Sequence, residues 1–291
     1  MMKLLIVGGA GQVGKELASR APAEWDVRAV DRQQLDITDS AAVERQVADF
    51  QPDVIINAAA YTAVDRAESE QALAYAINRD GPAALAAAAH HAGAALLHIS
   101  TDYVFPGDKA GTYREDDQTG PTGVYGASKL AGEEAVAAAC PRHIILRTAW
   151  VFGAYGNNFV KTMIRLARDR DQLSVVSDQL GSPTYAGDIA ETLLAIARQV
   201  AGKADAPWGI YHYSGAPYTC WSDFAGALLD HAAEAGIIAR KPRINPITTA
   251  EYPTPAQRPA NSRLDCSKIG AAFGIAPSDW QAALRDITRY A

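Results

Sequence analysis

Short apolar runs alternate with longer segments of helical periodicity through the first half of the chain. Each run is too short for a globular helix and is typical of a strand buried on both faces of a parallel sheet. The runs cover residues 3–7, 26–30, 53–57, 95–100 and 143–146, and the main helical segments cover about 68–78, 82–91 and 125–139. This alternation predicts an α/β fold built on a doubly wound parallel sheet with right-handed crossovers.

The pattern becomes less regular after Trp150. Helical periodicity covers 158–169, 186–200 and 221–235, and short strands are predicted at 173–176 and 209–213. Asp265 and Ser278 are candidate N-caps for two final helices. The segment 241–262 is predicted as a loop because it is rich in proline, with Pro242, Pro246, Pro253, Pro255 and Pro259. Such a sequence is typical of a smaller, discontinuous domain added to the sheet.

Three glycines stand directly after the first predicted strand. Gly8, Gly11 and Gly14 have the spacing G-x-x-G-x-x-G and precede a helix-forming segment. A glycine turn lets the backbone approach a pyrophosphate, and the helix N-terminus supplies free N–H groups and a positive dipole end. The sequence therefore predicts a Rossmann dinucleotide-binding domain. We expect this domain at 1–150 plus about 186–213, and a substrate domain at 151–185 and 214–291.

The second predicted strand ends in an acidic residue followed by a basic one. Asp31 could accept hydrogen bonds from an adenosine ribose, which favours NAD, whereas Arg32 could hold a 2′-phosphate, which favours NADP. The sequence does not decide between them. Asp36 stands either within reach of the adenine or as a turn or N-cap residue before a helix at Ser40, and both interpretations stay open.

Tyr125 and Lys129 are four residues apart in a predicted helix, so their side chains share one face. A free phenol titrates near pH ~10, but a nearby ammonium favours the phenolate and lowers its pKa. The pair therefore predicts a proton donor or acceptor that works near neutrality. Tyr-x-x-x-Lys also occurs by chance, as an exposed tyrosine beside a solvated lysine. The glycine turn and the Ser100-Thr101 step at a strand end favour catalysis.

Charge and composition narrow the class of protein. The chain has 291 residues, of which 48% are hydrophobic, and a formal net charge of −6. The hydrophobic content is enough for a large core, and the charge argues against a nucleic-acid or anionic-membrane surface. No apolar run reaches the ~20 residues that span a bilayer, and no signal peptide is visible.

The cysteines bear on the compartment in which the protein is expected, and the histidines bear on metal binding. Cys140, Cys220 and Cys266 are far apart and odd in number, which is typical of thiols in a reducing compartment and predicts a cytoplasmic protein. The six histidines show no metal-ligand spacing, so we expect no metal. The oligomeric state stays open, with a homodimer as one option.

Several stretches distributed over nearly the whole chain form a joint pattern. They are Gly11 to Gly14, Asn57 to Asp65, Ser100 to Phe105, Tyr125 to Glu133, Arg147 to Val151, Gly156 to Phe159 and Arg258 to Ser262. Together they resemble the extended short-chain dehydrogenase/reductases and, within these, the dTDP-4-dehydrorhamnose reductase family. The resemblance implies reduction of the C4 keto group of dTDP-4-dehydro-L-rhamnose to dTDP-L-rhamnose, a step toward cell-surface polysaccharide. NADPH is the expected coenzyme, with NADH left open.

The resemblance also implies residue roles. Tyr125 would donate a proton to the carbonyl oxygen, Thr101 would hydrogen-bond the same oxygen, and Lys129 would hold the nicotinamide ribose. The coenzyme would lie against Gly8, Gly11, Gln12, Val13, Gly14, Asp31, Arg32, Asp36, Ile37, Ala58, Ala59, Ala60, Tyr61, Ile99, Tyr125 and Lys129. The sugar nucleotide would lie against Thr62, Val64, Thr101, Asp102, Tyr103, Tyr125 and Trp150, with Arg258 and Arg263 as candidates for its diphosphate.

Each of these assignments has a structural alternative. Thr101 could cap a strand end, Trp150 could be an ordinary core residue, and the two arginines could stand on the surface. Glu16 and Asp188 match two acidic positions that hold a divalent cation in some of these reductases, but residues 289–291 do not supply a third acid.

Other functions are found on chains that share parts of this pattern. The related 4,6-dehydratases need a glutamate where this chain has Tyr103. An epimerase or another nucleotide-sugar reductase remains an alternative. The chain also resembles the regulatory subunit of methionine adenosyltransferase, a binding module on the same fold. The intact set of Thr101, Tyr125 and Lys129 argues for catalysis instead.

Overall fold

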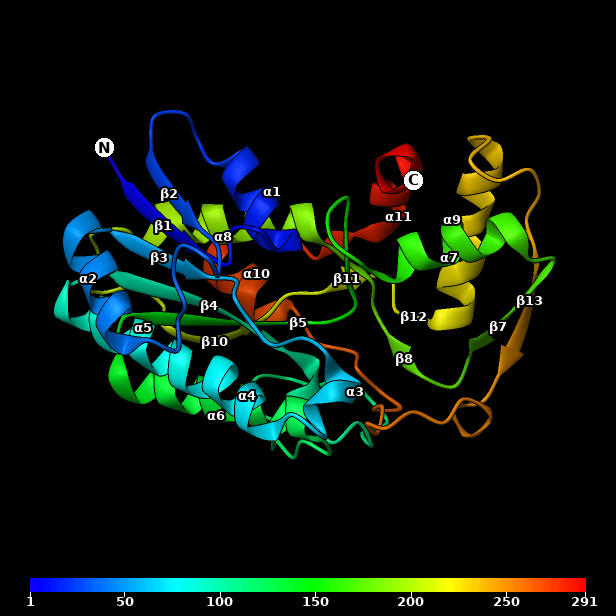
Figure 1. Ribbon diagram of the computed structural model, residues 1–291, viewed down its shortest axis with the longest axis horizontal. Coiled ribbons are helices and arrows are strands. Elements are labelled where there is room, and N and C mark those ends of the chain that lie inside the picture. The colour runs from blue at the N-terminus through cyan, green and yellow to red at the C-terminus, as the bar shows by residue number, and fades with distance from the viewer.

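A six-stranded parallel sheet forms the centre of the molecule in the computed structural model, which describes residues 1–291 (Figure 1). The strand order is β10-β5-β4-β3-β1-β2. The strands are β1 (Lys3–Val7), β2 (Asp26–Val30), β3 (Val54–Asn57), β4 (Ala95–Thr101), β5 (His143–Thr148) and β10 (Gly209–His212). The chain order reverses at β1, because β2 and β3 lie on opposite sides of it. Such a reversal leaves a crevice at the carboxyl ends of the strands, where ligands of open α/β sheets bind.

Helices cover both faces of this sheet, as its buried strands require. Alternate side chains of a strand point to opposite faces, so Leu4 and Ile6 join one core while Leu5 and Val7 join the other. The first face carries α1 (Gln12–Arg20), α8 (Ala186–Val200) and α10 (Ser267–Phe273). The second face carries α2 (Ser40–Phe50), α5 (Gly81–His91) and α6 (Val124–Ala139). The doubly wound Rossmann arrangement is confirmed.

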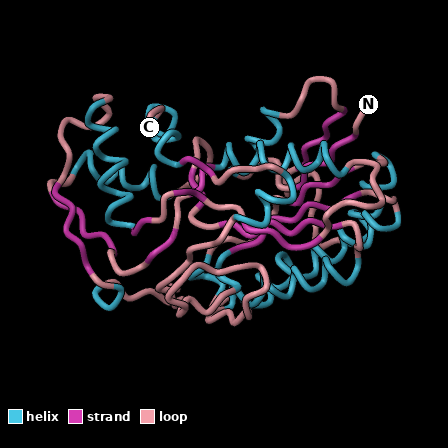
Figure 2. The backbone as a smooth tube through the Cα atoms, turned by 180° about the vertical axis from the view of Figure 1, so that it is seen from behind, coloured by secondary structure: helices cyan, strands magenta, loops and turns pink.

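A second lobe with its own core lies beyond the carboxyl ends of the strands (Figures 1 and 2). Its helices are α7 (Phe159–Asp169), α9 (Trp221–Glu234) and α11 (Trp280–Leu284). Its short strands are β6 (Val151–Phe152), β7 (Gln172–Val176), β8 (Leu180–Gly181), β9 (Thr184–Tyr185), β11 (Gly215–Ala216), β12 (Thr219–Cys220), β13 (Arg243–Ile247) and β14 (Ser278–Asp279). The exact division of the chain into two domains stays a prediction. Helix α10, from the C-terminal part, packs Ile269 and Phe273 into the core of the first lobe.

Two predictions of secondary structure were wrong. The proline-rich segment is not entirely loop, because β13 pairs in parallel with β7 and places Pro246 opposite Val175. Proline is tolerated there because β13 is an edge strand. The predicted helix at 68–78 is divided into α4 (Gln71–Tyr75) and a π-helical turn at Ala76–Asp80, after the separate short helix α3 (Val64–Ala67).

The two predicted N-caps are each displaced by one residue. Cys266 precedes α10, and the Asp265 carboxylate instead accepts a hydrogen bond from the Ser267 amide at 2.8 Å. Asp279 caps α11, while the Ser278 hydroxyl donates to Asp188 at 2.6 Å. In length and hydropathy, none of the helices meets the requirements of a membrane span.

Candidate active site

The glycine turn closes tightly between β1 and α1. Gly8 has a φ of +85°, which favours glycine. A Cβ on Gly8 would lie 2.6 Å from the Ala59 nitrogen, and a Cβ on Gly14 would lie 2.1 Å from the Gly8 oxygen. The turn, α1 and the segment after β3 are therefore packed too closely for side chains at these positions. The result is a bare backbone cradle that fits a pyrophosphate.

The start of α1 offers its amides to this cradle. Gly11 is the N-cap and supplies no side-chain cap, and no acidic residue stands in the first turn. The N–H groups of Gln12 and Val13 thus stay available at the positive end of the helix dipole. The Gln12 side chain accepts a hydrogen bond from Asn158 at 3.0 Å, which ties the turn to the second lobe.

The loop after β2 gives Asp31 and Arg32 different environments. Asp31 Oδ1 accepts hydrogen bonds from the Gln33 and Gln34 amides at 2.9 and 3.1 Å, so this oxygen helps to close the loop. Arg32 is exposed beside it. An exposed guanidinium at this position has the geometry to meet a phosphate on the adenosine ribose.

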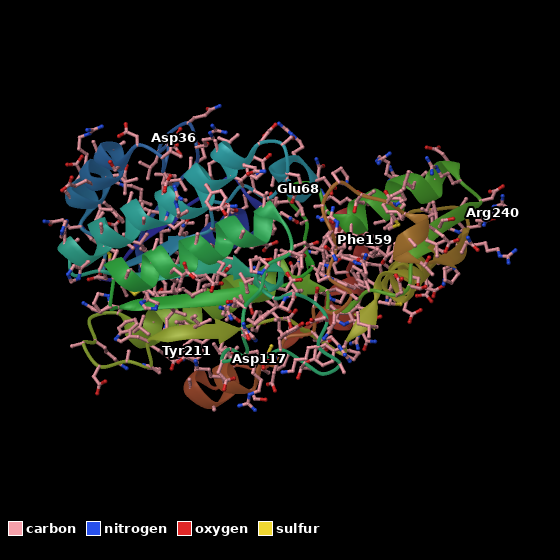
Figure 3. The ribbon with its side chains drawn as sticks, turned by 90° about the horizontal axis from the view of Figure 1, so that it is seen from below. Asp36, Glu68, Asp117, Phe159, Tyr211 and Arg240 are labelled. Atoms are coloured by element: carbon pink, nitrogen blue, oxygen red, sulfur yellow. The ribbon has the colours of Figure 1, made fainter.

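Asp36 and Ile37 lie farther along the same edge, and Figure 3 shows Asp36 at the outside of the first lobe. Asp36 accepts hydrogen bonds from the amide and the hydroxyl of Thr38, which lower the pKa of its carboxyl. It is a turn residue, because Asp39 is the N-cap of α2. Ile37 is buried, and its side chain fills the space over Gly81.

The segment after β3 passes over the glycine turn and then reaches the second lobe. The Ala58 amide donates to the Val7 carbonyl at 2.9 Å, so Ala58 and Ala59 stay beside the turn. The Tyr61 hydroxyl donates to Glu70 at 2.7 Å. Ala60 and Val64 are half-buried, and Thr62 is exposed.

Thr101 lies at the carboxyl end of β4, where its side chain organises the next turn. Its hydroxyl donates to Asp102 at 3.0 Å and accepts from the Tyr103 amide at 3.2 Å. Burial raises the pKa of Asp102 to about 6, against hydrogen bonds from Ser262 and Thr101. The ring of Tyr103 lies edge-on to that of Tyr125, with centroids 5.4 Å apart. The structure thus brings Thr101, Tyr103 and Tyr125 together.

Tyr125 stands in the first turn of α6 and is held as a neutral phenol. Burial raises its pKa above the ordinary value, a hydrogen bond with Thr101 opposes the rise, and the negative charge of Asp102 adds to it. The expectation that Lys129 lowers this pKa is wrong for this structure, because the Lys129 amine is turned to other partners. A neutral phenol is the form that can donate a proton.

Those partners of Lys129 are on β4. Its Nζ donates to the Ile99 carbonyl at 2.7 Å and lies 3.4 Å from His98 Nε2. Burial lowers the pKa of Lys129 to about 8, and the charge of Glu133 opposes this effect. The predicted pair therefore shares one helix face, as expected, but its amine is anchored on the neighbouring strand.

A cavity of about 660 Å³ opens between the lobes beside Tyr103. Trp150 lines it with a φ of +46°, and its ring stacks on Trp221 with centroids 3.6 Å apart. Phe159, labelled in Figure 3 where the lobes meet, lies 4.6 Å from Trp221 between ring centroids. Trp150 is therefore a wall of this cavity. Other lining residues are Asp65, Met163, Leu166, Leu173, Val175, Val176, Gln179, Tyr252, Arg258 and Ser262.

Sequence reasoning missed Phe159 and Trp221 as site residues. Phe159 belongs to one of the stretches that carry the family resemblance, so a signal was present. No signal in the sequence marked Trp221, because α9 meets Trp150 only in the folded protein.

The two candidate arginines have different positions. Arg258 lines the cavity and is held by Asp65 at 2.7 Å and by the Tyr103 hydroxyl at 3.1 Å. The Arg263 guanidinium instead donates to Asn261 and to the Ala110 carbonyl, outside the cavity lining. Of the two, Arg258 is the candidate for a diphosphate.

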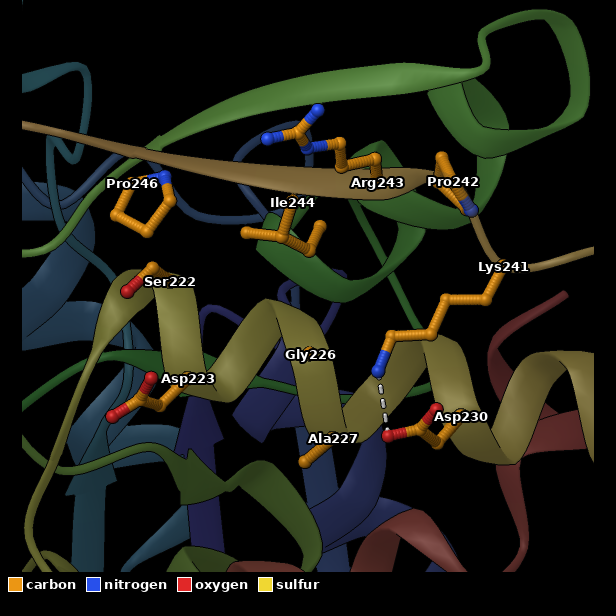
Figure 4. A pocket seen from close by; sticks show the side chains of 10 residues that line it. All are labelled: Ser222, Asp223, Gly226, Ala227, Asp230, Lys241, Pro242, Arg243, Ile244 and Pro246. Atoms are coloured by element: carbon orange, nitrogen blue, oxygen red, sulfur yellow. Dashed lines mark hydrogen bonds and ion pairs between the residues drawn. The ribbon is translucent and has the colours of Figure 1, made fainter.

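A second hollow of similar volume, about 660 Å³, lies between α9 and the start of β13 (Figure 4). Asp223, Asp230, Lys241 and Arg243 give it a mixed charge, and Lys241 donates to Asp230 at 2.7 Å. None of the predicted coenzyme or sugar residues lines this hollow.

The two candidate metal ligands have partners of their own. Glu16 accepts a hydrogen bond from Arg20 at 2.8 Å, and Asp188 accepts from Ser278. No group of three or more His, Cys, Asp or Glu side chains is arranged to hold a metal ion.

The doubly wound sheet carries a glycine cradle after β1, Thr101 at the end of β4, and Tyr125 and Lys129 on α6 beside β4. This arrangement defines an NAD(P)-dependent oxidoreductase of the short-chain dehydrogenase/reductase class. The family described as RmlD substrate binding domain matches residues 2–290. The chain belongs to this family, which is that of the dTDP-4-dehydrorhamnose reductases.

Individual relatives resemble the chain over its full length. The dTDP-4-dehydrorhamnose reductase of Aggregatibacter actinomycetemcomitans is 51% identical, with 100% of both chains covered. That of Sinorhizobium fredii is 46% identical over 98% of this chain and 96% of its own. The crystal structure of the Bacillus anthracis enzyme in complex with NADP superimposes with a TM-score of 0.92, at 37% identity and 99% coverage of both chains.

Proposed function

We propose that this protein catalyses the NADPH-dependent reduction of the C4 keto group of dTDP-4-dehydro-L-rhamnose to dTDP-L-rhamnose, with Tyr125 as the proton donor. Relatives of up to 51% identity carry that reductase name, and a structural relative binds NADP. The observation in this chain that carries the proposal is the neutral Tyr125 phenol beside Thr101, which ends β4 at the same carboxyl edge of the parallel sheet as the glycine turn after β1.

The residues of the first lobe would bind the coenzyme. The bare backbone at Gly8, Gly11 and Gly14, with the amides of Gln12 and Val13, would hold the pyrophosphate. Arg32 would meet a 2′-phosphate, which favours NADPH over NADH. Ala58, Ala59 and Ile99 would border the cleft, and Lys129 would hold the nicotinamide ribose. Bound NADPH supplies the hydride that reduces the carbonyl carbon.

The chemistry assigned to the protein is a proton transfer. As negative charge develops on the C4 oxygen, the Thr101 and Tyr125 hydroxyls would stabilise it, and Tyr125 would give up its proton. A phenol with a raised pKa stays protonated until that charge appears. Proton donation that follows the build-up of charge on the C4 oxygen is the order that reduction of a carbonyl requires.

The cavity beside Tyr103 would hold the sugar nucleotide. Trp150 and Trp221 give the cavity flat aromatic surfaces that suit stacking with a nucleobase. Arg258 lines the same cavity and would bind the diphosphate. The sugar would then extend past Tyr103, Thr62 and Val64 toward Tyr125. A cytoplasmic location and a homodimer are parts of the same proposal, and the buried free thiols of Cys140, Cys220 and Cys266 agree with a reducing compartment.

The test is NADPH oxidation at 340 nm with dTDP-4-dehydro-L-rhamnose, for the wild type and Tyr125→Phe. We expect kcat to fall by about 10²- to 10⁴-fold in the variant, while NADPH binding is retained. Tyr211→Phe is the matched control, because Tyr211 of β10 is also buried and also donates a phenolic hydrogen bond, to the Pro207 carbonyl. Wild-type protein that binds NADPH without turnover would support a regulatory module instead.

A further inference from the structure

A buried line of side chains connects three elements behind the catalytic helix. Asn57 at the end of β3, His98 on β4 and Lys129 on α6 are 0%, 0% and 2% exposed. Asn57 Nδ2 lies 3.0 Å from His98 Nδ1, and His98 Nε2 lies 3.4 Å from Lys129 Nζ. The proton-donor chemistry described above uses neither Asn57 nor His98.

The hydrogen bonds of Asn57 fix which nitrogen of His98 carries the proton. Asn57 Oδ1 accepts the Ala59 amide at 3.0 Å, and a backbone N–H can only donate. The nitrogen of the Asn57 amide therefore faces His98 and donates to Nδ1. Burial, together with the charge of Lys129, holds the pKa of His98 well below its usual value, so the ring is neutral. A neutral imidazole that accepts at Nδ1 carries its proton on Nε2.

This tautomer directs an N–H at the Lys129 nitrogen. An ammonium has three donors and no lone pair, so it cannot accept that hydrogen bond, whereas an uncharged amine can. The other charged group that acts on Lys129 is Glu133, on the same helix. The Glu133 carboxylate is ion-paired with Arg147 of β5 at 2.6 Å and also accepts a hydrogen bond from Ser100.

We propose that Asn57 and His98 are positioning residues for Lys129. Asn57 selects the Nε2–H tautomer of His98, and His98 thereby favours the uncharged form of the lysine while the Ile99 carbonyl holds its place. The pair keeps Lys129 ready to lose its proton close to neutral pH. After each turnover the Lys129 ammonium would give a proton to the Tyr125 phenolate and, as the uncharged amine, would take up another from water. The part that concerns turnover rests on the reductase function proposed above, whereas the tautomer does not.

The first experiment reads the tautomer directly. In protein labelled with ¹⁵N-histidine, the His98 signals are identified by their absence from His98→Gln. We expect a protonated Nε2 and an unprotonated Nδ1 at pH 7, and in Asn57→Leu we expect a shift toward the Nδ1–H form. A wild-type His98 that is charged or protonated on Nδ1 overturns the proposal, whether or not the enzyme turns over.

The second experiment is the pH dependence of kcat/KM, which reports the ionisable groups of the free enzyme. With a Lys129 pKa of about 8, the wild type should lose about tenfold of its activity between pH 7 and pH 9. In Asn57→Leu and His98→Leu this fall should move to higher pH, because the donor facing the ammonium is weakened or removed. A lower kcat/KM whose fall stays at the wild-type pH would mean that the two residues serve only the fold, and would overturn the proposal.

His98→Gln is the conservative variant, and it distinguishes loss of the hydrogen bonds from a general effect on folding. Its amide can accept from Asn57 through oxygen and donate to Lys129 through nitrogen, so the wild-type pH dependence should be retained. A His98→Gln profile that matches His98→Leu would contradict the assigned hydrogen-bond directions.

Discussion

The indole ring of Trp150 stacks on that of Trp221, with the ring planes 12° apart and the centroids 3.6 Å apart. Trp150 follows β5 of the first lobe, and Trp221 begins α9 of the second lobe. The pair therefore joins the two lobes at the wall of the cavity. A Cβ on Gly181 would lie 2.5 Å from the Trp150 ring, so the glycine leaves room for this arrangement.

Removing either ring should weaken sugar-nucleotide binding without affecting the coenzyme. Base–aromatic stacking contributes about 1–3 kcal/mol, which corresponds to about 5- to 150-fold. We expect Trp150→Ala and Trp221→Ala to raise the KM for the sugar nucleotide within this range, and to leave the KM for NADPH within about twofold. Trp208→Ala is the control, because Trp208 bonds to the Ala204 carbonyl away from the cavity. An unchanged KM in Trp150→Ala would end its assignment to the substrate.

Gly14→Ala should damage coenzyme binding. The added Cβ would lie 2.1 Å from the Gly8 oxygen, so the turn has to move by about 1 Å. Because the amides of this turn form the proposed pyrophosphate site, we expect the Kd for NADPH, measured by fluorescence titration, to rise by about 10- to 100-fold. Gly111→Ala is the matched control, since a Cβ there meets nothing within 4 Å. Equal affinity in both variants would contradict the pyrophosphate site.

Arg32→Ala should change the choice of coenzyme. Hydrogen bonds to a charged group contribute about 1.5–3 kcal/mol, so we expect the KM for NADPH to rise by about 10- to 150-fold and that for NADH to stay nearly unchanged. Arg28→Ala, which removes an exposed arginine of β2, should alter neither. Equal losses for both coenzymes would mean that Arg32 does not meet a 2′-phosphate.

Asp102 should make the folded protein less stable as the pH rises from about 4 to 6. Its pKa is about 6 in the folded protein against 3.8 for the free group, so the unfolded chain releases the proton first and folding is favoured while the group is protonated. At 1.36 kcal/mol per pKa unit, this difference amounts to about 3 kcal/mol.

Urea unfolding at pH 4 to 7 measures this effect. The free energy of unfolding of the wild type, minus that of Asp102→Asn, should fall by roughly this amount over the range. Asp80→Asn, which alters an exposed ion pair with Arg79, should show no such trend. A constant difference for Asp102→Asn would contradict the raised pKa.

Local signals in the sequence determined much of the fold and part of the site. The five apolar runs became β1, β2, β3, β4 and β5, because short apolar runs of this kind are typical of strands in a parallel sheet; β2, at the sheet edge, is the least buried of them. The glycines at 8, 11 and 14 and the spacing of Tyr125 and Lys129 are likewise local, because they depend on one turn and one helix. These features follow from backbone geometry within a few residues.

Tertiary structure decided the rest. The direction of the Lys129 amine depends on β4, where Ile99 and His98 receive it, and burial rather than the lysine sets the pKa of Tyr125. The Trp150–Trp221 wall, the strand that contains Pro246, and the choice of Arg258 over Arg263 all depend on segments that meet only after folding. Periodicity and spacing report on neighbours along the chain, whereas these contacts and their desolvation arise between distant segments.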